Sequence, residues 1–206
     1  MSYALPLAEL ALVNLIGIVS PGPAFLLVSR AAARQSRGTA FGLSLGVAIA
    51  ATLWAAAACF GIALLMAQAA PLYRAIQLAG GLYLIWLGIG AWRAPGQPAA
   101  TVPAQERGAG RSVMMGAALN LGNPKIVIFF TSIFVTLLPA HAPLWLRLVA
   151  IGIVGVQEAA WYLLVAVLFS QPRVQAAYRR VSLWIERGVG TLLIGLGARI
   201  LAAARI

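Results

Sequence analysis

Acidic residues, lysine, histidine and cysteine are all scarce in this sequence of 206 residues. It has four glutamates and no aspartate, one histidine, one lysine and one cysteine, Cys59. A single thiol cannot form an intramolecular disulfide or carry out dithiol redox chemistry. The apolar stretches hold no Ser/His/Asp set, paired aspartates or cluster of metal ligands, and His141 has no second ligand candidate nearby. The sequence therefore favours neither an enzyme nor a metal site, and it implies no cofactor.

No stretch between the apolar segments is long enough to form a separate soluble domain. Hydrophobic residues make up 62% of the chain, charged residues 9%, and the mean hydropathy is +0.93. This composition is typical of an integral membrane protein, whose surrounding partner is a lipid bilayer. At roughly 20 residues per crossing there is room for about six transmembrane helices. We predict them at residues 5–29, 38–67, 72–92, 112–138, 144–170 and 183–203.

The net charge of +11 would suit a nucleic-acid partner, but the basic residues are scattered between apolar segments, so we expect none. Cytoplasmic loops of membrane proteins carry an excess of arginine and lysine. The predicted connections 30–37, 93–111 and 171–187 together hold ten arginines. The opposite side holds four, at positions 74, 147, 199 and 205. We therefore expect the first group in the cytoplasm and both chain termini on the periplasmic side.

Two of the predicted helices are interrupted near their middles by proline. Proline removes a backbone donor and clashes with the preceding turn, so a continuous helix is disfavoured there. Ser20 and Asn123 suit the N-cap position, and the prolines that follow them suit the first helical position. Each break would expose free N–H groups at membrane depth, where irregular backbone is tolerated only inside protein or beside a cavity. We predict that the breaks line a transport site that includes Ser20, Pro21, Gly22, Pro23, Asn123, Pro124 and Lys125.

Two charged residues are expected deep in the membrane. Lys125 is the only lysine and follows the second break, while Glu158 is the only acidic residue expected in the middle of a span. The other glutamates are expected near helix ends or in loops, at positions 9, 106 and 186. A charge at this depth costs roughly 3 kcal/mol and is usually functional. We interpret Lys125 as the group that binds a substrate carboxylate beside a helix N-terminus, and Glu158 as the proton-coupling or ammonium-binding group. The alternatives are a structural ion pair between the two or, for Lys125, a side chain that reaches to the interface.

Several amide side chains at similar depth could line the same cavity: Asn14, Asn120, Asn123 and Gln157. Asn123 is explained equally well as an N-cap. A separate pattern, glycine at every fourth position, predicts close approach of another helix backbone at Gly38, Gly42 and Gly46. The sequence leaves open whether this stripe packs within one subunit or between the subunits of a homo-oligomer.

The two halves of the chain resemble each other. Pro21 and Pro124 are 103 positions apart, and the glycines at 81 and 88 align with those at 190 and 197 at an offset of 109. Three helices per repeat would insert the second copy upside down, as in many secondary transporters. We therefore predict an all-α integral membrane fold of six transmembrane helices in two inverted three-helix repeats, with the first and fourth helices broken. The repeats would be residues 1–92 and 112–206, joined by a cytoplasmic linker at 93–111.

Three motifs, taken together, resemble the lysine exporter (LysE/RhtB) superfamily, and within it the homoserine/threonine exporter branch. They are Ser-Pro-Gly-Pro at 20–23, Leu-Ala-Gly-Gly-Leu-Tyr-Leu-Ile-Trp-Leu-Gly at 78–88 and Asn-Leu-Gly-Asn-Pro-Lys at 120–125. The resemblance covers essentially the whole chain. It implies a multi-pass protein of the bacterial inner membrane that exports amino acids or related small metabolites, driven by the proton gradient. Many members carry Asp or Asn directly after the Pro-Gly-Pro motif, whereas this chain has Ala24.

We therefore interpret the chain as a secondary active exporter whose partners are an amino-acid-like substrate and protons. A passive channel built from paired half-helices is the first alternative. A buried lysine and glutamate argue against it, because strong binding slows conduction. A purely structural membrane protein would leave the cost of both charges unexplained.

Overall fold

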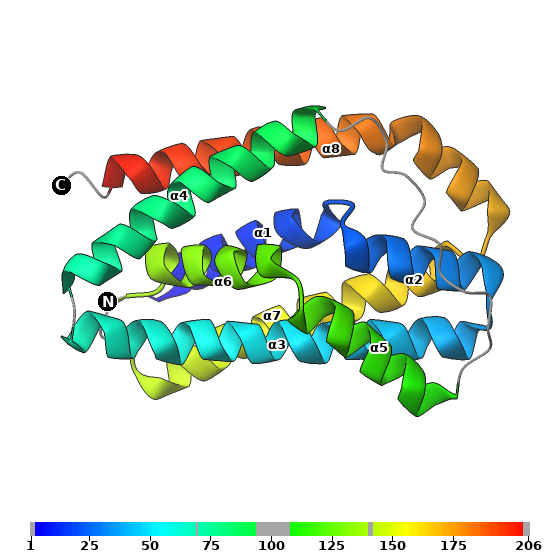
Figure 1. The fold of residues 1–206 in the computed structure, drawn as a ribbon, viewed down its shortest axis with the longest axis horizontal. Helices are drawn as coiled ribbons and strands as arrows, with labels where there is room; N and C mark the ends of the chain where they lie inside the picture. Colours follow the sequence, from blue (N-terminus) through cyan, green and yellow to red (C-terminus); the bar gives the residue numbers. More distant parts are fainter. Residues whose placement is uncertain (1–2, 69, 94–107, 140–141, 204–206) are drawn as a thin grey trace.

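The computed structural model describes residues 3–68, 70–93, 108–139 and 142–203 (Figure 1). Within these ranges the chain is helical and has no strand, which confirms the predicted all-α fold. The helices are α1 (Ala4–Val19), α2 (Pro23–Arg34), α3 (Arg37–Gln68), α4 (Ala70–Arg93), α5 (Ala109–Leu121), α6 (Pro124–Leu137), α7 (Leu144–Leu168) and α8 (Pro172–Ala203). Most of the predicted linker, together with His141, lies outside the described residues.

Both predicted breaks are present. The α1–α2 pair is bent by 58° and the α5–α6 pair by 65°. At the second break Asn123 is the N-cap, because its side-chain oxygen accepts a hydrogen bond of 3.1 Å from the Lys125 N–H, and α6 begins with Pro124. The first break differs from the prediction, since Gly22 rather than Ser20 is the N-cap of α2. A residue that precedes proline is pushed toward extended backbone, so Gly22, with ψ −176°, cannot enter a helix before Pro23.

The helices are arranged with α6 in the interior of the bundle. Figure 1 shows α4 and α8 side by side along one edge, α3 and α7 on the opposite side, and α1 with α6 between them. The side chains of Phe130, Ile133 and Phe134 on α6 are each at most 1% exposed. Because the second half of the broken pair is buried among its neighbours, its N-terminus ends inside the molecule rather than at a surface.

The glycine stripe on α3 packs against α5 within the same chain. A Cβ atom built at Gly42 would lie 2.7 Å from the Cβ of Ser112, and one at Gly46 would lie 2.7 Å from the backbone N of Ala117. Side chains cannot fit at these distances, so the two backbones approach as closely as predicted. Gly38 does not take part, because its nearest neighbour outside the adjoining residues is the Ser36 hydroxyl at 3.8 Å.

Four glycines bring α4 and α8 into backbone contact. A Cβ at Gly81 would lie 3.1 Å from the carbonyl oxygen of Gly197, and one at Gly88 would lie 2.5 Å from that of Gly190. These are the glycines that align between the two halves of the sequence. At the offset of 109 residues Gly81 corresponds to Gly190, and Gly88 corresponds to Gly197. The contact between Gly81 and Gly197 therefore corresponds to the contact between Gly190 and Gly88, so the same two contacts are obtained when the halves are exchanged.

The surface is apolar enough for a bilayer. Many large hydrophobic side chains are more than half exposed, among them Leu12, Leu53, Leu148, Val156 and Leu192. By length and composition α3, α7 and α8 can each cross a membrane, and each bent pair counts as one further span. The described residues therefore offer up to five spans. A sixth span over α4, and with it the six-span repeat, stays a prediction.

One boundary in the prediction was wrong. The connection expected at 171–187 is the first part of α8, which begins at Pro172. No glycine or proline stands between residues 173 and 187 to end a helix there. Arg173, Arg180 and Arg187 of this segment are exposed, and Arg187 lies 5.6 Å from the ring of Trp92 and 5.8 Å from that of Trp184. Glu186 is thereby placed within the candidate span 180–202 instead of in a loop.

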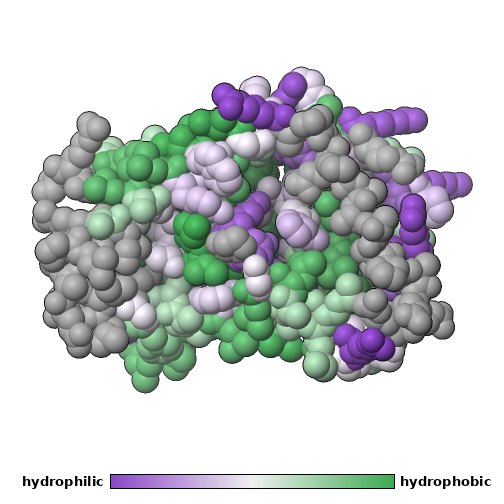
Figure 2. Space-filling model, in the orientation of Figure 1, coloured by the Kyte–Doolittle hydropathy of each residue, from purple (hydrophilic) through white to green (hydrophobic). Residues whose placement is uncertain are grey.

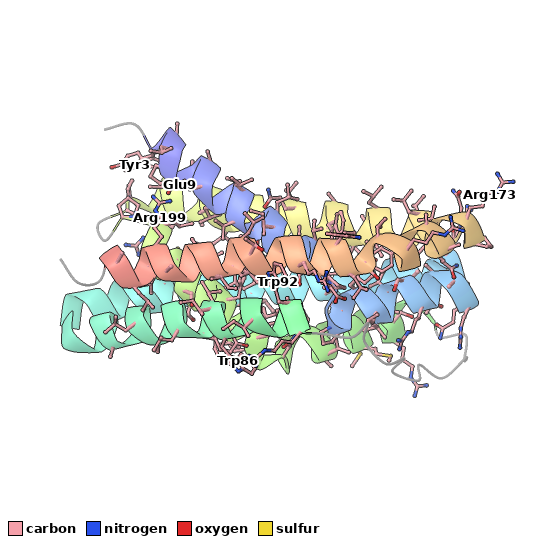
Figure 3. All side chains as sticks on the ribbon, turned by 90° about the horizontal axis from the view of Figure 1, so that it is seen from above. Tyr3, Glu9, Trp86, Trp92, Arg173 and Arg199 are labelled. Atoms are coloured by element: carbon pink, nitrogen blue, oxygen red, sulfur yellow. The ribbon has the colours of Figure 1, made fainter. Side chains whose placement is uncertain are left out.

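The two ends of the molecule differ in charge. Figure 2 shows hydrophilic residues gathered toward one end and in a hollow near the centre, with apolar residues over much of the remaining coloured surface. In Figure 3 Arg173 extends from this hydrophilic end, while Glu9 and Arg199 meet at the other, where they form a salt bridge of 3.1 Å. Of the arginines counted for the predicted cytoplasmic side, Arg173 therefore lies at the hydrophilic end, whereas Arg187 lies beside Trp92, nearer the middle of the bundle.

Candidate functional site

The two breaks meet at a cavity of about 60 Å³, which we call the Glu158 chamber. The first break, together with the start of α2, contributes four residues to its wall, Ser20, Gly22, Pro23 and Ala24. The second break contributes Asn123 and Lys125. Glu158 and Tyr162 reach it from α7, and the rest of the wall is apolar, with Phe129 and Phe130 of α6 and Leu193 of α8. Residues of both breaks therefore line one cavity, and its use as the transport site stays a prediction.

Lys125 extends from one break toward the other. It is the second residue of α6 and is partly buried. A Cβ atom built at Gly22 would lie 4.0 Å from the Lys125 Nζ. A glycine at this position leaves the lysine ammonium space beside the N-terminus of α2, so a positive charge lies among backbone N–H groups that also favour anions.

Glu158 is 5% exposed and faces the chamber from the middle of α7. No salt bridge joins it to Lys125, and among the described residues its carboxylate has no hydrogen bond. A structural ion pair between the two residues, which the sequence left open, is therefore not formed. Each charge faces the chamber without a partner among the described residues, which is costly unless a ligand, water or a proton compensates it.

The N-terminus of α2 is also left without a cap. Its N-cap residue, Gly22, has no side chain to accept a hydrogen bond from the first N–H groups, whereas α6 is capped by Asn123. Free N–H groups at a helix start form a ready site for an anion. Ala24 is 4% exposed and adds no polar side-chain atom to the chamber wall. At this position many members of the superfamily that the sequence resembles have Asp or Asn. The uncapped backbone therefore remains available to a ligand.

Three of the predicted cavity residues hold helices together and are not on the chamber wall. Asn14 donates a hydrogen bond of 2.9 Å to Gln157, and Gln157 donates one of 3.1 Å to the carbonyl oxygen of Ala11. These contacts join α1 to α7. Asn120 donates one of 2.9 Å to the carbonyl oxygen of Val47, which joins α5 to α3.

A second cavity of about 200 Å³ adjoins the first, and we call it the Glu186 chamber. The two share Lys125, Leu87, Leu193 and three residues of the first break, Ser20, Gly22 and Pro23. Its remaining wall comes from α4, through Trp86, Gly90 and Ala91, from α8, through Glu186, and from Pro21.

Glu186 was not predicted as a site residue, because it was expected in the connection 171–187. A signal for its burial was present, since Glu186 shares one helical face with Gly190, Leu193 and Gly197 at spacings of three or four residues. That face is buried against the neighbouring helices, and Glu186 is only 5% exposed.

Two broken helices whose N-termini meet at a buried, charged chamber are the architecture of a membrane transport protein. The family model of the LysE type translocator matches residues 15–204, and the chain belongs to this family. It is therefore a transporter and not an enzyme.

Curated relatives agree with this assignment. The chain is 33% identical to the threonine efflux protein of Escherichia coli (strain K12) over 195 residues, which cover 93% of this chain and 95% of the relative. It is 32% identical over the same shares to the threonine efflux protein of Salmonella typhi. A homoserine/homoserine lactone efflux protein of Salmonella typhi is 29% identical over 142 residues, or 65% of each chain. No solved structure matches the chain.

Proposed function

We propose that this protein is a proton-driven exporter of amino acids or closely related metabolites in the bacterial inner membrane. The observation that carries the proposal is the Glu158 chamber, where Lys125 and Glu158 lie beside two helix N-termini without neutralising each other. An amino acid is a zwitterion and offers the complementary pair of charges. The threonine and homoserine efflux proteins among the relatives are consistent with such a substrate.

In this proposal the substrate carboxylate is held by Lys125 and the uncapped start of α2. Ammonium and backbone N–H groups both donate hydrogen bonds to a carboxylate, and charge-assisted bonds of this kind are about twice as strong as neutral ones. Apart from the two breaks, Glu158 and Tyr162, the chamber wall is apolar, which strengthens the attraction by excluding water. Asn123 keeps its oxygen engaged as a cap, so its main contribution is to fix the position of Lys125.

Glu158 then serves the other end of the substrate and the proton. A carboxylate in an apolar chamber is stabilised either by a bound ammonium group or by taking up a proton. These two states exclude each other, so binding of protons and substrate at Glu158 would alternate. Such competition is a direct way to exchange a proton for a substrate across the membrane.

We further propose that the chain is built from two inverted repeats, residues 1–92 and 112–206, joined by a cytoplasmic linker at 93–111. The paired breaks and the glycine contacts between α4 and α8, which are unchanged when the halves are exchanged, support this division. It would place the arginine-rich end in the cytoplasm and both termini in the periplasm.

Export can be tested by tolerance. Cells that overproduce the protein are expected to grow at concentrations of threonine, homoserine or toxic analogues that stop the growth of control cells, because the exporter lowers the internal concentration. Growth yield is measured across a panel of individual amino acids. The matched control is Lys125→Ala, present in the membrane in equal amount. If no compound in the panel gives tolerance that depends on Lys125, the proposed function is wrong.

Orientation can be tested with reporter fusions. A reporter that is active only in the periplasm should be active when fused at the C-terminus and inactive when fused at residue 100, since positive charge holds the linker inside. The paired cytoplasmic reporter should give the opposite pattern at both points. A C-terminus that reports from the cytoplasm would exclude the proposed orientation. It would also exclude the arrangement in which an even number of spans leaves both termini in the periplasm.

A further inference from the structure

Glu186 is a buried carboxylate that the proposed transport step does not use. It is 5% exposed, and its Oε2 atom is buried without a hydrogen-bond partner in the part of the chain that the structure describes. The adjacent Arg187 does not neutralise it, because that guanidinium lies over the rings of Trp92 and Trp184 on the exposed side of α8. An unpaired acidic group is costly to bury, so its position against a cavity calls for a ligand.

The cavity beside Glu186 also contains the one lysine of the chain. Lys125, Ser20, Gly22 and Pro23 line both chambers, so a single ammonium group serves two cavities, each of which has its own acid. Glu158 reaches its chamber from α7 and Glu186 reaches the other from α8. A zwitterion whose carboxylate is held at Lys125 can therefore direct its ammonium group to either glutamate.

The sizes of the chambers favour the Glu186 side in this conformation. A water molecule needs about 10–15 Å³ of such space, so the Glu158 chamber, at about 60 Å³, has room for only a few waters. The Glu186 chamber is more than three times larger, at about 200 Å³. Gly90 and Ala91, which line it, stand within three residues of Arg93, where α4 ends and the predicted cytoplasmic linker begins.

We propose that the Glu186 chamber is a second subsite for the substrate, on the arginine-rich side of Lys125, in which Glu186 binds the ammonium group of an amino-acid zwitterion. The inference rests on the proposed function and extends it. The substrate enters with its carboxylate at Lys125 and its ammonium at Glu186. The carboxylate then stays at Lys125 while the ammonium group moves from Glu186 to Glu158, so that a single lysine holds the substrate throughout the transfer.

The test uses the full-length protein in sealed vesicles that expose its arginine-rich face, with radiolabelled threonine. Glu186→Gln keeps the shape and removes the charge, so the KM for threonine from that face should rise roughly 10- to 100-fold, as for the loss of one charged hydrogen bond. An analogue in which a hydroxyl replaces the amino group should show no such change. Glu186→Asp should restore much of the affinity, and Glu9→Gln, which removes a glutamate at the opposite end, should leave the KM unaltered.

A second variant covers the case in which Glu186→Gln fails to fold. No atom outside the adjoining residues lies within 4 Å of a Cβ built at Gly90, so Gly90→Leu should fold, fill part of the Glu186 chamber and also raise the KM from the arginine-rich face. An unchanged KM in the foldable variants, or an equal loss for threonine and its hydroxy analogue, would overturn the subsite. If the unaltered protein transports no amino acid, the proposed function fails and the subsite with it. Normal transport with unaffected variants removes the subsite alone.

Discussion

Glu158→Gln is expected to abolish export against a concentration gradient while retaining exchange of substrate for substrate at reduced affinity, because Lys125 still binds the carboxylate but glutamine no longer pairs with the ammonium group. Glutamine keeps the shape of the side chain but cannot bind and release a proton. An exporter needs an energy source that biases its two facing states differently, and the voltage component of the proton gradient alone supplies about 2.3 kcal/mol per charge per 100 mV. Without a titrating group in the chamber, that energy no longer reaches the substrate.

The measurement uses vesicles containing the purified protein, with substrate accumulation followed after an imposed pH gradient. Substrate counterflow without a gradient serves as the internal control, because it requires binding and conformational exchange but no net proton movement. Accumulation by Glu158→Gln equal to that of the unaltered protein, with the same dependence on pH, would assign coupling to another group. Flux that never saturates in the unaltered protein would instead indicate a passive channel.

Lys125→Ala should reduce export by at least about 100-fold, equivalent to roughly 3 kcal/mol of lost substrate or transition-state binding. The variant removes the only cation that faces either chamber among the residues the structure describes, so the substrate carboxylate would be transferred from water to the chamber wall without that charged partner. Initial export rates in loaded vesicles, corrected for the amount of folded protein, provide the measurement. Arg199→Gln removes a cation at the far end of α8 and is the matched control.

The same argument applies to the substrate. A methyl ester lacks the negative charge that Lys125 is proposed to bind, so it should be exported poorly by the unaltered protein. Lys125→Ala should discriminate much less between the acid and its ester. Efficient transport of the ester, or a fully active Lys125→Ala variant, would show that the carboxylate is recognised elsewhere.

Features set by local sequence could be predicted most fully. The second break followed the expectation because an Asn-Pro pair is both a cap and a helix start, and the structure contains the corresponding hydrogen bond to the Lys125 N–H. The first break was predicted within two residues. The position of its cap was wrong because two prolines compete there, and the later one, Pro23, decides where α2 begins.

Features that depend on the rotation of a helix could not be predicted as well. Asn14 and Gln157 have the composition expected of a polar cavity, yet they face each other across α1 and α7. Glu186, in contrast, was expected in a loop because arginines at 179, 180 and 187 surround it in the sequence, yet it lines a cavity. In the folded chain Arg180 and Arg187 are exposed, whereas Glu186, on another face of the same continuous helix, is buried. Which face is buried is set by the glycine contacts with α4, which involve residues about 100 positions away.

The glycine contacts between α4 and α8 also have a mechanical consequence. Side chains that interdigitate can repack when helices slide, but the backbone of Gly88 meets that of Gly190 with no side chain between them to absorb a shift. The two helices should therefore move as one plate. Trp86 and Glu186, attached to opposite members of this plate, would keep a constant separation during a cycle. The change between the two facing states would then take place at the bent pairs α1–α2 and α5–α6. Their interrupted backbones would flex, while α4 and α8 move together as a rigid unit.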